Sequence, residues 1–293
     1  EPSAQQRAAQ RAAWAASADP VKPSSPYYTI FATVRDMEYG EAFPSQAAKD
    51  RAVETLPYLA RNTATEWRRD PLGDRQWVYV RRPNWFLGAH FGNRASGLVR
   101  TGPAFLWHPV AGMLVHGLNT GDDSTWTTFV GGQADADQDV LDATYYAGDP
   151  RLGRAVPDPR AVRGAAPLGM GWTTSGGKVR KNVVVGAGEV RLRTAGAGDL
   201  TEQLPLVLHA SDTVSFSDGT ALAYGGSTSA SAGGLLVRRG EVSLRLEWDR
   251  PLDVQLVARK QVYFRAADRR LHALLLPHTG PLEIRITADD DEG

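Results

Sequence analysis

Aromatic, histidine and amide side chains gather in one stretch of the chain, between Arg75 and Phe129. Flat aromatic rings stack on sugar rings, and Asn and Arg offer oriented hydrogen-bonding groups, so this mixture is typical of a surface that binds carbohydrate. The competing interpretation is that Trp residues in strands pack in the core. If the stretch binds a sugar, the side chains of Asn93 and Arg94 would bind a carboxylate of the ligand while the aromatic rings stack on its sugar rings. The binding candidates are Tyr79, Trp85, Asn93, Arg94 and Trp107.

Two His residues of this stretch, His90 and His108, are candidates for acid–base catalysis. A neutral imidazole near Arg94 or Tyr79 would combine a proton acceptor with a group that stabilises developing charge. The competing interpretation is a His that hydrogen-bonds the backbone at the end of a strand. Both interpretations stay open on the sequence.

Metal binding is a further alternative, although we expect no cofactor. His108 and His116 flank a predicted hairpin at residues 109–112, and residues that face one another on paired strands can share an ion. Asp122 or Asp123 would then add an oxygen ligand. The spacing matches no compact zinc motif. Three alternate acidic residues have the spacing that begins a calcium-binding loop: Asp135, Asp137 and Asp139. The Gly and the distal Glu that an EF-hand loop requires do not follow them.

Composition excludes several classes of function. The 293 residues include 33 basic and 33 acidic side chains, so no global field favours nucleic acid or an anionic membrane. The chain has no Cys, which excludes thiolate catalysis and Cys-ligated metal sites. No apolar run approaches the roughly 20 residues that span a bilayer. Because the chain starts without Met or a signal segment, we expect a processed chain or an excised fragment, secreted or periplasmic.

Short strands separated by frequent turns predict a mainly β fold. Strand-like segments are most regular from Lys178 onward, where turns recur every 8–12 residues or so, and this spacing favours a large antiparallel β-sandwich. Residues 27–35 have the same β-branched and aromatic character. Residues 3–18 predict a short N-terminal helix, and residues 45–69 predict one helical excursion because apolar positions recur at helical spacing.

We divide the chain into three parts. Residues 1–26 hold the N-terminal helix and a Pro-rich linker. Residues 27–174 form a first β-rich part, which includes the helical excursion and a long polar loop at 131–167. Residues 175–293 form a second β-rich part that completes the sandwich.

Three segments give the chain a resemblance to a known family. Residues 81–94 (RRPNWFLGAHFGNR) end in an Asn-Arg pair, and residues 102–109 (GPAFLWHP) followed by 112–115 (GMLV) form a Leu-x-His-Pro…Gly hairpin. Residues 199–206 belong to a similar run of short strands. Over residues 27–290 the chain resembles the C-terminal β-sandwich of heparinase II/III-like polysaccharide lyases and, more distantly, that of hyaluronate-type lyases.

The resemblance implies β-elimination on an acidic polysaccharide. In that family an α/α toroid precedes the sandwich and carries most of the catalytic groups, so it implies a toroid domain or chain as partner. The sandwich closes one wall of the cleft and can contribute a His, which here implies His108 or, as second choice, His90. The alternative, from another class, is a noncatalytic carbohydrate-binding or assembly module.

Overall fold

The computed structural model describes residues 45, 47–48, 51, 62–70, 74–93, 101–117, 124–134, 143–174, 177–259 and 268–290. The chain divides into two compact units, Glu1–Ala60 and Arg61–Gly293, and every described strand belongs to the second. The helix predicted at 3–18 and the strand predicted at 27–35 lie outside the described residues. Within the described part no helix is long and apolar enough to cross a membrane.

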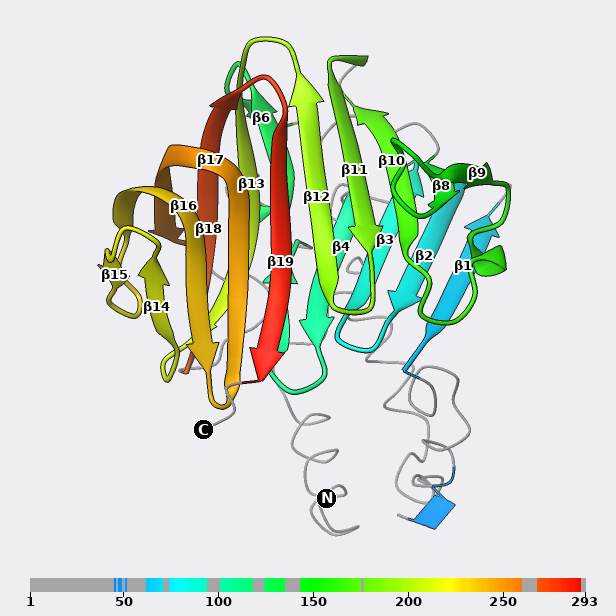
Figure 1. The fold of residues 1–293 in the computed structure, drawn as a ribbon, viewed down its shortest axis with the longest axis horizontal. Coiled ribbons are helices and arrows are strands. Elements are labelled where there is room, and N and C mark those ends of the chain that lie inside the picture. The colour runs from blue at the N-terminus through cyan, green and yellow to red at the C-terminus, as the bar shows by residue number, and fades with distance from the viewer. Residues whose placement is uncertain are drawn as a thin grey trace, which may run out of the picture. The chain divides into compact units, whose positions relative to one another are not determined.

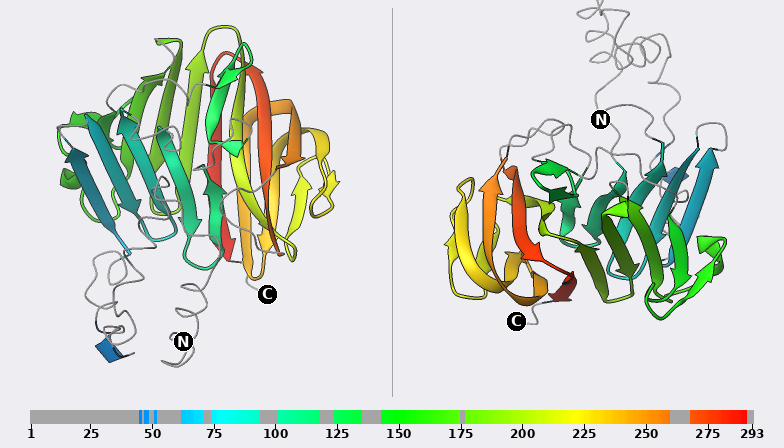
Figure 2. Two further views of the ribbon diagram at one scale, coloured as in Figure 1. Left: turned by 180° about the vertical axis from the view of Figure 1, so that it is seen from behind. Right: turned by 90° about the horizontal axis from the view of Figure 1, so that it is seen from above.

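The second unit is one antiparallel sheet that folds into two layers (Figures 1 and 2). The first layer contains, in order of pairing, β9 (Arg154–Val156), β8 (Thr144–Ala147), β10 (Leu168–Thr174), β11 (Val179–Val185), β12 (Glu189–Gly196), β19 (Leu282–Asp290), the first half of β17 (Val242–Ala258), β16 (Thr228–Arg239), β14 (Thr213–Phe216) and β15 (Ala221–Leu222).

The second layer begins at β1 (Ala64–Asp70) and continues through β2 (Arg75–Arg81), β3 (Phe86–Gly92), β4 (Gly102–His108), β5 (Gly112–His116), β13 (Asp199–His209) and β18 (Arg269–Thr279) to the second half of β17. Two short strands extend it beside the first half of β13: β6 (Thr127–Val130) and β7 (Gln133–Ala134). These pairings confirm the prediction of a mainly β, antiparallel fold.

Strand β17 belongs to both layers and makes the corner between them. Its residues 242–248 pair with β19, whereas its residues 255–258 pair with β18. The pairing with β16 shifts at the same level: Ala232 pairs with Leu252 and Gly234 with Glu247, so β17 carries the extra residues. Trp248 Nε1 donates a hydrogen bond of 2.6 Å to the Ala232 carbonyl. A strand that passes from one layer to the other through a bulge is the usual way to build such a corner.

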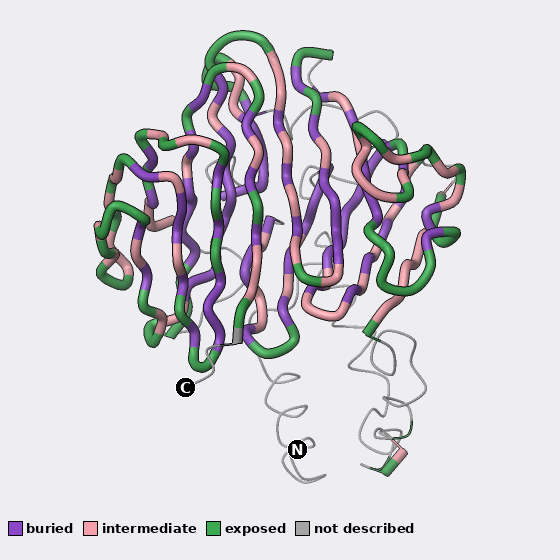
Figure 3. The backbone as a smooth tube through the Cα atoms, viewed as in Figure 1, coloured by how far each residue is buried: buried purple, intermediate pink, exposed green. Residues whose placement is uncertain are grey.

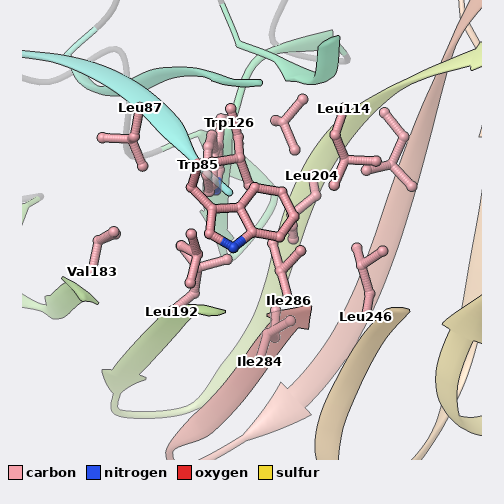
Figure 4. Close-up of a cluster of buried hydrophobic side chains, with 14 of the residues drawn as sticks. Trp85, Leu87, Leu114, Trp126, Val183, Leu192, Leu204, Leu246, Ile284 and Ile286 are labelled. Carbon is pink, nitrogen blue, oxygen red and sulfur yellow. The ribbon is translucent and has the colours of Figure 1, made fainter. Parts of the chain in front are cut away.

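The core lies between the layers and follows from strand alternation (Figure 3). In β12 and β19 every second side chain is buried, because the alternate residues of a strand point to opposite faces of a sheet. Leu192, Ile284 and Ile286 from the first layer approach Leu204 and Trp85 from the second layer (Figure 4). Burying these side chains contributes about 1.5–3 kcal/mol each to stability.

A buried ion pair also joins the layers. Lys181 Nζ of β11 lies 3.0 Å from Glu202 Oε1 of β13, and both side chains are almost fully covered. Thr194 and Thr128 donate hydrogen bonds of 2.9 and 2.6 Å to Glu202 Oε2. Both carboxylate oxygens therefore have donors, as a buried charge requires.

Two predicted segments differ from the structure. The end of the helical excursion at 45–69 is strand β1, in which Ala64 pairs with Arg81 and Asp70 with Arg75. Pairing with β2 overrides the local helical spacing, and residues 52–61 lie outside the described part. The loop predicted at 131–167 contains β7, β8, β9 and a 3-10 helix at Pro159–Ala161. These elements are two to four residues long, too short to give a periodic signal.

The division at residue 174 does not separate two sheets. Strand β10 ends at Thr174 and pairs along its whole length with β11, which begins at Val179. The β-rich parts predicted at 27–174 and 175–293 therefore share one continuous sheet in their described residues.

Candidate functional site

One side of the second layer faces away from the core, and we call it the outer face. Its residues follow from the strand register. Tyr79 pairs with Gly88, Gly88 with Phe105, and Phe105 with His116. Paired residues in an antiparallel sheet project on the same side, so these residues share one face. The neighbouring Val115 is fully buried on the opposite side, where it pairs with the core residue Leu206.

The same face continues across the other half of the layer. Gln203 of β13 pairs with Leu275 of β18, and Leu275 pairs with Gln255 of β17. These residues alternate with Leu204 and Leu274, which are fully buried in the core. The outer face therefore runs without interruption from β2 to β17, because strand pairing is continuous across the layer.

Five partly exposed aromatic side chains and one guanidinium occupy the part of the outer face formed by β2, β3 and β4. Their rings touch at tilted or edge-on angles: ring centroids are 6.5 Å apart for Tyr79 and Phe86, and 5.2 Å apart for Phe86 and Phe105. A Cβ atom on Gly88 would collide with the Phe105 ring, so the absence of a side chain there lets this ring lie across β3. We call this group the aromatic patch: Trp77, Tyr79, Arg81, Phe86, Phe105 and Trp107.

Arg81 is the charged member of the aromatic patch. Its guanidinium carbon lies 5.0 Å from the centroid of the Trp107 ring, within the range of a cation–π interaction. Nε and Nη1 of Arg81 are covered and have no hydrogen-bond partner among the described residues. Burial lowers the pKa of Arg81 below its usual range. The aromatic patch thus holds a partly desolvated cation without a carboxylate in the described part of the chain.

The neighbouring Arg82 points into the protein, where its Nε and Nη1 have acceptors and its Nη2 has none among the described residues. It is fully buried, and its Nε donates to the Ala166 carbonyl at 2.9 Å. Its Nη1 donates to the carbonyls of Ala64 and Arg81 at 3.2 and 2.8 Å. Burial lowers the pKa of Arg82 to about 10. Arg82 therefore ties β1 to the segment before β10, whereas Arg81 lies on the outer face.

An open groove of ≈ 1100 Å³ occupies the other half of the outer face. Leu275 and Pro277 supply apolar wall, and the fully buried Gln203 lies behind this wall. Nε2 of Gln203 donates to the Thr125 carbonyl at 2.8 Å, which fixes the orientation of this amide. The other chemically distinct lining residues are Phe129, Asp199, Thr201, Ser231, Arg250, Asp253, Arg259 and His278.

Two of the groove residues are held firmly by the backbone. Arg250 donates to the carbonyls of Pro281 and Thr279 at 2.8 and 3.0 Å. His278 Nδ1 lies 2.8 Å from the Gly280 carbonyl oxygen. Burial lowers the pKa of His278, so this imidazole is neutral at pH 7. The groove consequently offers a preoriented guanidinium and a preoriented neutral imidazole beside an apolar wall.

Trp85, predicted to stack on a sugar, is part of the core. It is 0% exposed and packs edge-on against His108, with ring centroids 5.5 Å apart (Figure 4). The stacking role expected for Trp85 is thus corrected, because a fully covered ring offers no face to a ligand. Trp107 and Tyr79 are partly exposed, and the structure brings both into the aromatic patch.

The two catalytic candidates are buried in different environments. His108 is 4% exposed, and its Nδ1 accepts hydrogen bonds from the backbone N–H groups of Ala111 and Val110 at 3.1 and 3.3 Å. His108 therefore closes the turn between β4 and β5, as expected for a His that hydrogen-bonds the backbone at the end of a strand. His90 is 3% exposed and packs against the Trp77 ring at 5.4 Å. Neither His presents an open ring nitrogen to the groove.

The remaining predicted site residues do not converge. His108 lies on the core side of β4, whereas His116 pairs with Phe105 on the outer face, so the two do not face one ion. No group of metal-ligating side chains occurs among the described residues. Asn93 is exposed at the end of β3, and its backbone N–H donates to the Asp74 carbonyl at 2.9 Å. Outside the described residues lie Arg94, Asp122, Asp123, Asp135, Asp137 and Asp139.

The sequence interpretation missed Arg81 and every residue of the groove. The strand-like alternation of residues 75–81 contains a signal for Arg81. Trp77, Tyr79 and Arg81 are each two residues apart, so on a strand they must share one face. The spacing of Asp199, Thr201 and Gln203 is a weaker signal of the same kind. It marks one polar face of β13 without showing which strands lie beside it.

Comparisons with known proteins give distant structural similarity to several carbohydrate-active enzymes. A heparinase III has a TM-score of 0.45 at 8% identity, over 83% of this chain and 40% of that protein. A putative aldose 1-epimerase from Escherichia coli K12 has a TM-score of 0.41 at 9% identity, over 74% of this chain and 99% of that protein. The 4-alpha-glucanotransferase from Thermococcus litoralis has a TM-score of 0.39 at 10% identity, over 79% of this chain and 40% of that protein.

No family model matches the chain, and no curated protein is significantly similar to it in sequence. The chain spans 40% of the length of both the heparinase and the glucanotransferase. At these TM-scores and identities, the structural similarity carries no inference about activity.

Proposed function

We propose that the chain binds a carbohydrate on the outer face of its second layer, with the groove as the principal site. The observation that carries the proposal is the mixture of side chains in a groove of ≈ 1100 Å³. Sugar hydroxyls both donate and accept hydrogen bonds, so they suit a site with carboxylates, hydroxyls and guanidinium groups together. Phe129 and Leu275 add apolar surface for the C–H face of a sugar ring.

The extent of the outer face favours an oligosaccharide over a single sugar. The aromatic patch and the groove lie on the same side of one continuous layer. Partly exposed Tyr79 and Trp107 supply stacking surfaces at one end, and the groove supplies polar groups at the other. A glycan chain laid along the face would use both, because each sugar unit has an apolar side and a hydroxylated rim.

Lyase chemistry stays a prediction from the resemblance. His108 and His90, which it implied as the catalytic contribution of the sandwich, are both buried away from the groove. Binding is therefore the function that the geometry favours for this chain. In a lyase the catalytic base would come from a partner such as the α/α toroid. We also propose a secreted or periplasmic location, because polysaccharides are accessible there.

The experiment is a calorimetric titration of the chain with a panel of neutral and acidic oligosaccharides. Asp253 is exposed in the groove. We expect Asp253→Ala to weaken the glycan bound there about 2- to 10-fold, the usual effect of one hydrogen bond. Glu247→Gln is the matched control, since Glu247 is exposed on the first layer. If the double variant Asp253→Ala/Phe129→Ala binds the glycan as tightly as wild type, the groove is not the site. If no oligosaccharide of the panel binds the wild-type chain, the proposed function is wrong.

A lyase assay on the same samples separates the two classes of function. β-Elimination produces an unsaturated uronate that absorbs near 232 nm. Binding without a rise in this absorbance supports the proposed binding function. A rise from the chain alone would show catalysis within it, and the base would then have to be sought beyond the described residues.

A further inference from the structure

Arg81 differs from the other guanidinium groups of the described surface. Several of those form ion pairs with nearby acids, as Arg245 does with Asp289, and others, such as Arg180 and Arg238, are exposed to water. Arg81 has no such pair in the described part of the chain, although it is only partly exposed. A cation that loses water without gaining an acceptor is unfavourable for folding. The position of Arg81 therefore needs an explanation other than stability.

The neighbouring Arg82 shows how this protein treats a guanidinium with a structural role. Arg82 donates to Ala166, Ala64 and Arg81 carbonyls and to Thr65 Oγ1 at 3.3 Å. These four acceptors replace the water that Nε and Nη1 lose on burial, although Nη2 has no partner among the described residues. Arg81 has no counterpart to this set of acceptors among the described residues.

The surroundings of Arg81 suit an anion attached to a ring-shaped ligand. Arg81, Phe86 and Trp107 are consecutive partners across β2, β3 and β4, so they form one row on the outer face. The Trp107 ring lies under the guanidinium and restricts where it can move. Because Nε and Nη1 are covered, a guanidinium fixed in this way would donate a charge-assisted hydrogen bond to carboxylate or sulfate through Nη2.

We propose that Arg81 forms an anion subsite, which recognises a carboxylate or sulfate group on a sugar unit lying against the aromatic patch. This inference deepens the proposed function and rests on it: the groove would bind one part of the glycan, and Arg81 would select an acidic unit further along. The subsite accounts for a desolvated cation beside partly exposed aromatic rings. It also makes the outer face selective for charge although the chain has zero formal net charge.

The test compares matched ligands on Arg81 variants. Wild-type chain and Arg81→Gln are titrated with a uronate oligosaccharide, with its carboxyl-reduced neutral form, and with a sulfated neutral form. We expect Arg81→Gln to weaken the acidic ligand that fits about 10- to 100-fold, the range for a charge-assisted hydrogen bond, and to leave the neutral form unchanged. Whichever acidic form loses affinity identifies carboxylate or sulfate as the recognised group.

Two further variants separate recognition from structure. Arg81→Lys keeps the charge but loses the planar group that stacks on Trp107 and fixes the donor, so we expect it to recover only part of the affinity. Arg245→Gln is the control, because Arg245 is an exposed guanidinium on the first layer. We expect Arg81→Gln to keep the wild-type melting temperature, whereas replacing an Arg that supports the fold would lower it.

The outcomes distinguish this inference from the proposed function. If the neutral glycan binds and Arg81→Gln leaves the affinity for both acidic forms unchanged, the proposed anion subsite is wrong and binding in the groove stands. If no oligosaccharide binds but glucuronate alone quenches Trp fluorescence in an Arg81-dependent way, the anion subsite stands and the groove proposal fails. Equal loss for acidic and neutral ligands in Arg81→Gln would overturn the inference, since it would indicate damage to the face.

Discussion

The guanidinium carbon of Arg81 lies 5.0 Å from the centroid of the Trp107 ring, on the side of the sheet that faces away from the core. Its sequence neighbour Arg82 points the other way and is fully buried. Adjacent residues of a strand face opposite sides of the sheet, so one Arg supports the fold and the other remains available to a ligand. This pair of roles leads directly to the first prediction.

Arg82→Ala is expected to destabilise the protein, whereas Arg81→Leu is not. Loss of the Arg82 guanidinium leaves the carbonyl groups of Ala64 and Ala166 without a donor. Water can replace part of this loss, because Ala166 is exposed and Ala64 is half-buried, but the fully buried Arg82 side chain also loses its packing. We expect the free energy of unfolding to fall by about 1–3 kcal/mol. Urea denaturation followed by circular dichroism measures both variants. Equal destabilisation by the two changes would contradict the separate roles.

Trp85→Ala and Trp107→Ala are expected to act on different properties. Trp85 is fully buried, so its truncation should lower the free energy of unfolding by about 3–5 kcal/mol. Trp107 is partly exposed beneath Arg81, so Trp107→Ala should weaken glycan binding with a smaller loss of stability. Thermal melts and calorimetric titrations of both variants test this. If Trp107→Ala binds glycan as tightly as wild type, the aromatic patch is no binding surface.

The buried pair Lys181–Glu202 is expected to show strong coupling. Either single change, Lys181→Met or Glu202→Gln, disrupts an ion pair of 3.0 Å inside the protein. Removing one partner of a buried pair costs about 3–5 kcal/mol, because the other charge stays buried and unpaired. Lys181→Met with Glu202→Gln should be more stable than Lys181→Met alone, because the double variant leaves no buried charge unpaired. A double-mutant cycle by denaturation measures the coupling, and additive effects would count against a paired state.

Stability is expected to fall as pH drops below about 6.5, the pKa of an unperturbed His. Burial lowers the pKa of His272 and of His278 in the folded protein. Each unfolded His binds a proton at a pH where the folded one does not, so stability is complete above the unfolded pKa and is lost as pH falls through the folded pKa. Denaturation between pH 7.5 and 5 should show this decline. His272→Asn with His278→Asn should flatten the profile, and an unchanged slope would exclude these two residues.

Strand alternation predicts much of the second layer from sequence alone. Residues 75–81 carry this signal: Tyr79 lies on the face opposite Val78 and Val80, which are fully buried. The antiparallel, mainly β character follows from the same signal and from frequent turns. The strand β1 was not predictable, since its residues are polar and owe their conformation to pairing with β2.

The candidate site was predictable only in part, for reasons that lie in long-range packing. Trp85 and Trp107 both stand beside apolar residues in the sequence, and only contacts across the core decide that Trp85 is covered. Likewise, the missing acid partner of Arg81 depends on which strands lie beside it. The groove combines residues from β6, β13, β16, β17 and β18, which are up to 150 positions apart (Phe129 to Thr279). No local pattern specifies such an arrangement.

The measurement that tests carbohydrate binding most directly is a backbone and Trp side-chain NMR titration of isotope-labelled chain with the tightest oligosaccharide of the panel. We predict chemical-shift changes at Trp107 Nε1–H and at the amides of Thr201 and Gln203, which lie on the outer face. The Trp85 Nε1–H resonance, in the core, should stay in place. Shift changes confined to the first layer, with the outer face unaffected, would contradict the account.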